Sequence, residues 1–134
     1  MITTEDRLEI LELYGVQSHA VDGGDGEAWA ATYAEDGVFE SPTYQLTARG
    51  RDELRAFAEN SNGAALARGE QFRHVVTGIV LDEIEEGRVR ARAYMTILAT
   101  TAEGSRVDRS LVVHDELVRV AGSWLFRERK VYRD

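Results

Sequence analysis

Cysteine is absent from this chain of 134 residues, and histidine occurs only three times. The absence of cysteine excludes disulfides, zinc–thiolate sites, iron–sulfur clusters and thiol nucleophiles. Histidine is the only side chain that ordinarily changes its charge near neutral pH, so few side chains of this protein are suited to acid–base catalysis. The three histidines are therefore the first candidates for a catalytic role.

Positive charge is scarce as well. The chain has 16 lysines and arginines and 24 aspartates and glutamates, so its net charge is −8. Such a surface lacks the positive field on which binding to nucleic acid or to an anionic membrane depends. The longest apolar stretch, residues 75–81, is interrupted and far too short to span a bilayer. At the N-terminus no basic region precedes an apolar one, as a secretory signal would require. We expect a cytoplasmic protein with neither nucleic acid nor a membrane as its partner.

Proline occurs once, at Pro42, and neither a repeat nor a low-complexity linker divides the sequence. Residues 1–134 are therefore expected to form a single domain, which is long enough to bury a core of its own.

The first half of the chain is patterned as helices, and capping residues mark their ends. Thr3 or Thr4 can cap a first helix, and the glycine pair Gly23-Gly24 is expected to end it. Asp25 caps a second helix, which is predicted to end at Asp36-Gly37. The other elements predicted in this half are short strands over residues 38–40 and 44–48 and a third helix over residues 51–67.

From Gln71 onward, apolar and polar residues alternate with the period of two that is typical of strands. Four strands are predicted, beginning near residues 71, 88, 106 and 124. Gly78, inside the first of them, indicates a bulge or a strong bend. One face of the second carries small residues, which either let a helix approach closely or leave room for a cavity: Ala91, Ala93 and Ala99.

Three helices followed by antiparallel strands indicate an α+β protein in which helices pack on one face of a curved sheet. A bent sheet that helices close on one side forms a cone with a mouth, and ligands bind in concavities of this kind.

Four blocks of sequence, in this order and at these distances, resemble the SnoaL-like branch of the nuclear transport factor 2-like superfamily. The blocks are Leu13-Tyr14 through Asp22-Gly23-Gly24-Asp25 to Tyr33-Ala34-Glu35-Asp36-Gly37, then Gly50-Arg51-Asp52-Glu53-Leu54, Phe72-Arg73-His74-Val75-Val76-Thr77, and His114-Asp115-Glu116-Leu117-Val118-Arg119 with Gly122-Ser123-Trp124, Arg129 and Asp134. The resemblance implies a cone of three N-terminal helices packed on a curved, mostly antiparallel mixed sheet, and a homodimer formed through the sheet face. It specifies the reaction far less, because the fold hosts dehydratases, isomerases, cyclases, epoxide hydrolases, binding modules and transport factors.

His74 is the first candidate for a catalytic group, because it shares a strand face with Phe72 and Val76. A lone histidine in a strand is more often structural, but dehydratases similar to this chain place a catalytic histidine in the same Arg-His block. Asp22 lines up with an acidic residue that scytalone dehydratase and related lyases use. A carboxylate beside a histidine fixes its tautomer and raises its basicity, which is what a general base needs.

Two further residues of the first helix join the candidate site. His19 is three residues from Asp22 and can share its face of the helix, although a solvated histidine beside a turn-capping aspartate explains the pattern as well. Tyr14 lies two turns before Asp22, so its hydroxyl could line the same pocket and donate to a developing oxyanion. A tyrosine of the core is the alternative.

The aromatic residues Tyr33, Phe57 and Tyr94 are candidate pocket walls, although such residues usually belong to the core. Asp115 matches an acidic position that is frequent in the family and is a further pocket candidate. Arg129, on the next strand, could pair with Asp115 in a structural ion pair.

Departures from known enzymes narrow the function. The tyrosine on the first helix of ketosteroid isomerases falls at Gln17, and their catalytic carboxylate falls near Ser41, which speaks against that mechanism. Of the scytalone dehydratase site, the second histidine and the asparagine are missing, with Val113 in the latter position. Arg106-Val107-Asp108 has the Arg-x-Asp spacing of limonene epoxide hydrolases without a convincing second aspartate. No metal-ligand spacing, phosphate loop or dinucleotide motif is present, so neither metal nor cofactor is expected.

The leading hypothesis is a cofactor-free enzyme of secondary metabolism that acts on a small, apolar metabolite bearing a carbonyl group. His74 would transfer the proton and Asp22 would orient the imidazole ring of His74. Tyr14 would donate a hydrogen bond to the carbonyl oxygen as it gains negative charge. Elimination, isomerisation and ring closure all remain open as reactions. The alternative is a module of the same fold that binds a ligand or dimerises without catalysis.

Overall fold

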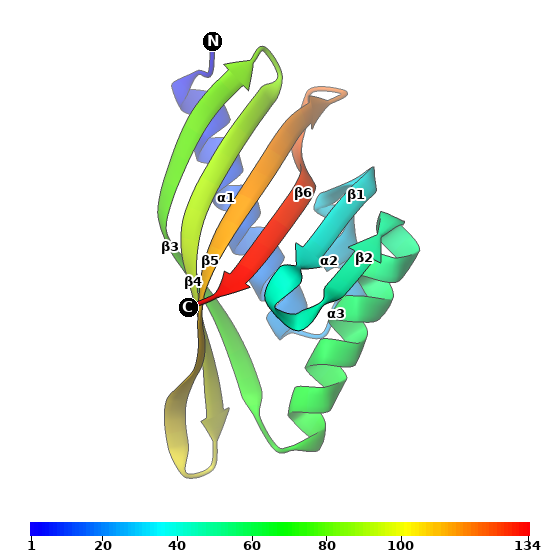
Figure 1. The fold of residues 1–134 in the computed structure, drawn as a ribbon, viewed down its shortest axis with the longest axis vertical. Coiled ribbons are helices and arrows are strands. Elements are labelled where there is room, and N and C mark those ends of the chain that lie inside the picture. The colour runs from blue at the N-terminus through cyan, green and yellow to red at the C-terminus, as the bar shows by residue number, and fades with distance from the viewer.

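The computed structural model describes residues 1–134, and Figure 1 shows helices lying behind and beside one sheet. The helices are α1 (Thr4–Asp22), α2 (Gly26–Ala31) and α3 (Gly50–Ala67), with a 3₁₀ turn, η1 (Pro42–Tyr44), between two strands. The strands are β1 (Tyr33–Ser41), β2 (Leu46–Arg49), β3 (Gln71–Glu85), β4 (Arg88–Thr101), β5 (Gly104–Val120) and β6 (Ser123–Arg133). None of the helices is long and apolar enough to cross a membrane.

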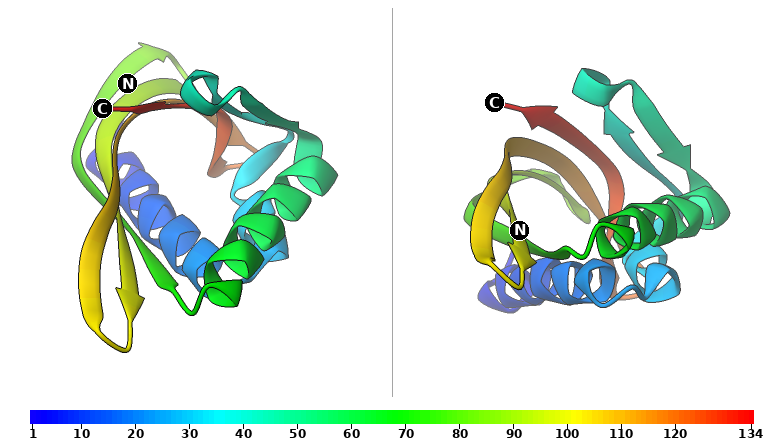
Figure 2. Two further views of the ribbon diagram at one scale, coloured as in Figure 1. Left: turned by 60° about the horizontal axis from the view of Figure 1, so that its bottom comes forward. Right: turned by 90° about the horizontal axis from the view of Figure 1, so that it is seen from below.

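The six strands form one sheet in the order β2-β1-β6-β5-β4-β3. Neighbouring strands are antiparallel except for β1 and β6, which run parallel, so the sheet is mixed. Figure 2 shows the sheet curving like an arch, with α1 and α3 across its open side. The prediction of an α+β protein with helices on a curved, mostly antiparallel sheet is confirmed.

A bulge in β3 contributes to this curvature, as the glycine in its sequence predicted. The pairing of β3 with β4 shifts register between Thr77 and Val80, and Gly78 lies there with φ of +63°. A side chain at Gly78 would also collide with the ring of Tyr94, because an added Cβ would lie 2.8 Å from Tyr94 Cδ2. Glycine is therefore required here by backbone conformation and by space.

The second helix ends earlier than its sequence predicts, at Ala31 rather than near Asp36-Gly37. The Thr32 hydroxyl donates to the carbonyl of Trp29 at 2.6 Å, and the amide of Phe126 donates to the Thr32 carbonyl at 2.9 Å. Pairing with β6 thus draws the chain out of the helix and into β1. Helical periodicity cannot register such a long-range strand contact.

Two clusters of buried apolar side chains form the core. One joins the helices to β4, β5 and β6 and contains Ala91 together with Ile10 and Tyr14 of α1. The other contains Ala99 together with Ala65 of α3. Ala91 and Ala99 are therefore buried core residues, and neither of them lines the cavity described below.

Candidate functional site

A cavity lies between the concave face of the sheet and the helices. All six strands, η1 and each of the three helices contribute to its wall, and ten of its fifteen lining residues are hydrophobic. Its empty volume is about 630 Å³ when the part open to solvent is included. Pockets that bind small molecules are mostly apolar, with a few polar groups that fix the orientation of the ligand. The polar groups in this wall are therefore the ones to examine.

His74 is one of these polar wall residues, and Asp22 stands behind it. The ring Nδ1 of His74 lies 2.6 Å from Oδ1 of Asp22, and the backbone amide of His74 donates to Oδ2 of Asp22 at 3.0 Å. The side chains are 16% and 8% exposed, respectively. Because a carboxylate accepts hydrogen bonds and does not donate them, the pair directs the Nδ1 proton to Asp22. In the structure Nε2 has no protein hydrogen-bond partner and is the free nitrogen of the ring.

The local fold explains why these two residues meet. β3 is an edge strand, so the amide of His74 is free of the ladder and can bind a side chain. Asp22 is the last residue of α1, where the negative end of the helix dipole disfavours a carboxylate. The hydrogen bonds from the amide and the ring Nδ1 of His74 offset this effect. The Gln71 side chain fastens the same junction, because its amide donates to the carbonyl of Asp22 at 3.0 Å.

A second polar group reaches the wall from β6. Arg129 lines the cavity, and its Nε and Nη2 donate to the two carboxylate oxygens of Asp115 at 2.8 and 2.9 Å. The hydroxyl of Tyr14 donates to Oδ2 of the same carboxylate at 2.5 Å. This predicted ion pair is therefore present, and it is buried, with the Asp115 side chain fully covered and that of Arg129 3% exposed.

The burial of the trio Tyr14, Asp115 and Arg129 determines the protonation states of Tyr14 and Arg129. Burial and the negative charge of Asp115 raise the pKa of Tyr14 far above its usual value, so the phenol stays protonated. Burial acts to lower the pKa of Arg129, but the Asp115 carboxylate outweighs it and the pKa rises. The trio is thus a neutral unit, in which a phenol and a guanidinium cation share one carboxylate.

Arg109 is a third polar group in the wall of the cavity. It lines the cavity, donates from Nε to Asp108 at 2.9 Å, and lies 5.9 Å from the ring centre of Tyr44 and 5.8 Å from that of Phe72. Arg106 binds both Asp108 and Glu70 just outside, and neither of its partners lines the cavity. The Arg-x-Asp pair noted in the sequence is therefore a surface ion pair rather than a cavity group.

The remaining predicted site residues divide between the cavity, the core and the surface. Phe57 lines the cavity as predicted, and so does Trp29. Tyr33 is fully buried in the core and does not line it. The prediction that Tyr94 is a pocket wall is wrong, because it is 62% exposed on the outer face of the sheet. Tyr94 alternates with Met95, which does line the cavity, so the two side chains leave β4 on opposite faces.

Three other candidates also lie away from the cavity wall. His19 is exposed and lines a shallow depression on the outside of the molecule, where Asp22 and His74 form part of the same surface. Tyr14 and Asp115 lie behind the wall, because Arg129 separates their carboxylate–phenol contact from the cavity. The expectation that Tyr14 and Asp22 line one pocket is therefore wrong in its geometry.

Sequence reasoning did not identify Arg129 and Arg109 as cavity residues. Arg109 could have been found, since it lies two residues before the buried Leu111 and so shares its face of β5. Arg129 lies two residues before the buried Val131, but alternation counted from the buried Phe126 places it on the outer face, because β6 contains a register shift between Phe126 and Glu128. The shift reverses which alternate residues face inward, so Phe126 and Arg129 point to the same side although three positions separate them.

Comparison with known proteins agrees with this architecture. Residues 3–130 match the family model described as a SnoaL-like domain. No curated protein sequence matches the chain significantly. Three solved structures illustrate what the fold resembles.

Aln2 from a Streptomyces species is 30% identical with a TM-score of 0.88, over 98% of this chain and 93% of that one. ActVI-ORFA from Streptomyces coelicolor is 33% identical with a TM-score of 0.85, over 96% and 97%. A protein from Catenulispora acidiphila, solved in complex with S-DNPA, is 32% identical with a TM-score of 0.84, over 98% and 96%.

Proposed function

The chain belongs to the SnoaL-like family of the nuclear transport factor 2-like superfamily, and we propose that it is a cofactor-free enzyme that moves a proton next to a carbonyl group. The observation that carries the proposal is the contact of 2.6 Å between Asp22 and a histidine that lines an apolar cavity. That a relative 32% identical to this chain was solved with a ligand, S-DNPA, supports a ligand-binding role for the fold.

His74 is the proton carrier in this proposal. With the Nδ1 proton directed to Asp22, the lone pair of Nε2 is free to take a proton from a ligand carbon adjacent to the carbonyl. Asp22 then stabilises the imidazolium that forms, since its carboxylate lies against Nδ1. Asp22 is a positioning residue, because it acts through His74 rather than on the ligand.

The carbonyl explains why no further reactant is needed. Removing the proton leaves its electron pair delocalised onto the carbonyl oxygen as an enolate. The enolate can recover a proton at another carbon, expel a hydroxyl group as water with the proton that His74 holds, or attack a second carbonyl to close a ring. Each route conserves electrons, so isomerisation, dehydration and cyclisation all fit the same pair of residues.

A generic ketone can test the proton transfer without knowledge of the natural substrate. The probe 2-tetralone is a bicyclic, mostly apolar ketone whose protons next to the carbonyl exchange with D₂O, and nuclear magnetic resonance follows the loss of their signals. Wild-type protein should accelerate this exchange, and His74→Gln should remove the acceleration. General acid–base groups typically contribute about 10²- to 10⁴-fold.

Glutamine suits position 74 because its amide can still donate to Asp22 and hold the junction together. The matched control is His114→Gln, which replaces an exposed histidine on the outer face of the sheet and should exchange like wild type. Equal exchange by His74→Gln and wild type would refute the catalytic assignment. Binding of 2-tetralone without any acceleration would instead indicate the ligand-binding module that is the alternative function.

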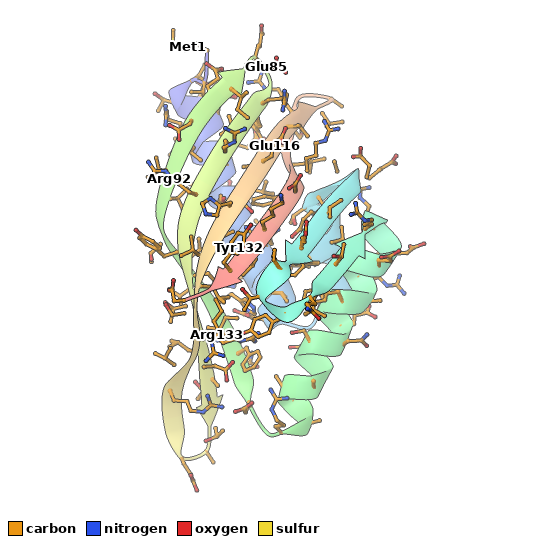
Figure 3. The ribbon with its side chains drawn as sticks, viewed as in Figure 1. Met1, Glu85, Arg92, Glu116, Tyr132 and Arg133 are labelled. Atoms are coloured by element: carbon orange, nitrogen blue, oxygen red, sulfur yellow. The ribbon has the colours of Figure 1, made fainter.

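A homodimer through the outer face of the sheet is part of the same proposal. The strand register places Val75, Tyr94 and Tyr132 on this face, and they are 40%, 62% and 38% exposed. Figure 3 looks onto this face and labels Tyr132. Apolar side chains exposed together on a sheet are typical of an interface. Light scattering should give twice the chain mass for wild type and a monomer for Tyr94→Asp.

A further inference from the structure

Ser61 carries a hydroxyl group in the cavity wall that binds no other protein atom. It is half-buried on α3 and lines the cavity together with Phe57, which lies one helical turn before it on the same face. A serine inside a helix can donate to the carbonyl four residues earlier, but Ser61 makes no such bond. The one fully covered side-chain polar atom without a partner is the hydroxyl of Tyr33, so the hydroxyl of Ser61 is accessible. A ligand in the cavity can therefore reach it.

The packing of α3 brings Ser61 to the end of the cavity where Asp22 holds His74. The next residue of α3, Asn62, lies against the turn that follows α1, because a Cβ added to Gly24 would be 2.7 Å from Nδ2 of Asn62. Gly24 is only two positions after Asp22, so this turn of α3 packs beside the residue that bonds His74. Ser61 and His74 both line the cavity. Their hydroxyl and imidazole groups therefore border the same end of it.

Other polar groups near the cavity are engaged with acceptors of the protein itself. The hydroxyl of Ser41 donates to a backbone carbonyl of β6 at 3.1 Å. Arg109 and Arg129 each donate to the carboxylate of an aspartate. The phenol of Tyr14, which the sequence suggested as the donor to the ligand, is bound to Asp115 behind the wall. The hydroxyl of Ser61 has no such competing acceptor.

The proposed proton transfer requires a donor of this kind. When His74 removes the proton, negative charge develops on the carbonyl oxygen of the ligand. A hydrogen-bond donor aimed at this oxygen stabilises the enolate more than the neutral carbonyl, and the effect is large in a cavity that excludes water. A serine hydroxyl is uncharged, so an apolar wall accommodates it at a lower cost of desolvation than a charged donor.

We infer that Ser61 is a second catalytic residue, whose hydroxyl donates to the carbonyl oxygen of the ligand while His74 takes the proton from the neighbouring carbon. The inference rests on the proposed function, since it names a further residue for the same proton transfer. The C–H bond of the ligand breaks, the Nε2–H bond of His74 forms, and the electron pair moves to the oxygen. Ser61 keeps its own proton throughout and acts only through its hydrogen bond.

Removing the hydroxyl tests this role. Ser61→Ala should lower kcat for the deuterium exchange of 2-tetralone about 10²-fold, the order of magnitude for the loss of one donor to an oxyanion. KM should change little, because an interaction made mainly in the transition state contributes little to binding of the ketone. The variant should fold as well as wild type, since the hydroxyl has no protein partner and alanine is the better helix former. Ser61→Thr keeps a hydroxyl and should retain most of the rate.

The infrared carbonyl stretch of bound 2-tetralone reports the hydrogen bond itself. The band should lie at a lower frequency in wild type and in Ser61→Thr than in Ser61→Ala, because a hydrogen bond weakens the carbonyl bond. Isotopic labelling of the carbonyl carbon separates this band from those of the protein. The matched control for rate and spectrum is Asn60→Ala, which removes an exposed polar side chain from the same helix and should behave like wild type.

The outcomes separate this inference from the proposed function. A kcat of Ser61→Ala equal to that of wild type would overturn the role of Ser61 and leave the assignment of His74 intact. A rise in KM alone would overturn it too, because the contact would then be made equally before the reaction. A fall in kcat that Ser61→Thr restores, together with the shift of the carbonyl band, would uphold it. If wild type accelerates no exchange, the proposed function fails and the role of Ser61 fails with it.

Discussion

The hydroxyl of Tyr14 donates a hydrogen bond of 2.5 Å to Oδ2 of Asp115, which lies 101 positions later in the chain. This bond joins α1 to the middle of the sheet at a carboxylate that Arg129 also holds. It assigns Tyr14 to the support of the cavity wall, because a donor bound to Asp115 is no longer available to a ligand. A structural role and a catalytic role for Tyr14 make different predictions for the same variant.

Tyr14→Phe should lower the free energy of unfolding by about 1.5–3 kcal/mol, the usual contribution of a hydrogen bond to a charged group. Urea denaturation followed by circular dichroism measures this change. The deuterium exchange of 2-tetralone, measured where the variant is folded, should stay near the wild-type rate. A Tyr14→Phe protein of wild-type stability that has lost the exchange would show instead that the phenol acts on the ligand.

The tautomer of His74 provides a direct test of its contact with Asp22. Because the carboxylate accepts from Nδ1 at 2.6 Å, the neutral ring should carry its proton on Nδ1 and leave Nε2 free. Nitrogen-15 chemical shifts distinguish the two ring nitrogens. Asp22→Asn should move the ring toward the Nε2–H form and slow the proton exchange, while His114 keeps its spectrum. A ring that is already in the Nε2–H form in wild type would contradict the orientation proposed for catalysis.

Alanine at Gly78 and alanine at Gly63 should change the stability of the fold in opposite directions. Gly78→Ala introduces a side chain at φ of +63° and 2.8 Å from Tyr94 Cδ2, so it should destabilise the fold by about 1–2 kcal/mol or more. Gly63→Ala, inside α3 with no atom within 4 Å of the new methyl group, should stabilise it by about 0.5–1 kcal/mol. Thermal unfolding measures both changes.

The double variant Gly78→Ala/Tyr94→Ala separates collision from backbone strain. If Gly78→Ala lowers stability as much in the Tyr94→Ala protein as in wild type, the strained φ angle accounts for the whole effect. Gly78→Ala with wild-type stability would mean that neither the φ angle nor the ring of Tyr94 requires glycine at this position.

The sequence predicted those parts of the fold that depend on neighbours along the chain. The helix cap expected at Thr3 or Thr4 and the period-two pattern of β3 both depend on residues a few positions apart, and both are present, with the cap at Thr3. The inward orientation of His74 follows from the same alternation. Its contact with Asp22, 52 positions earlier, came only from the family resemblance, because no local rule brings the end of α1 to an edge strand.

The predictions that were wrong depend instead on contacts between residues distant in the sequence. The predicted second helix did not account for the pairing of Tyr33 with Phe126 on β6, 93 positions later. Alternation counted from Phe126 puts Arg129 on the outer face, because the register shift in β6 changes which alternate residues point inward. Both errors occur where contacts distant in sequence override local preference.

The lowered pKa of Asp6 predicts how the stability of the fold changes at acidic pH. Hydrogen bonds from the backbone of Thr3 and from the indole of Trp124 lower the pKa of Asp6 from its usual value to about 2, and the charge of Arg119 acts in the same direction. Because the folded pKa lies below the unfolded one, ionised Asp6 stabilises the fold above about pH 4, near the pKa of an unfolded aspartate. This contribution is lost as the pH falls from about 4 to about 2.

Asp6→Asn should therefore be less stable than wild type at pH 7, and the difference should shrink through this window. Denaturation at a series of pH values measures it, and Asp52→Asn, an exposed aspartate in the first turn of α3, is the matched control. A difference that stays constant between pH 7 and pH 2 would mean that the carboxylate charge contributes nothing, and that Asp6 acts only through the shape of its hydrogen bonds.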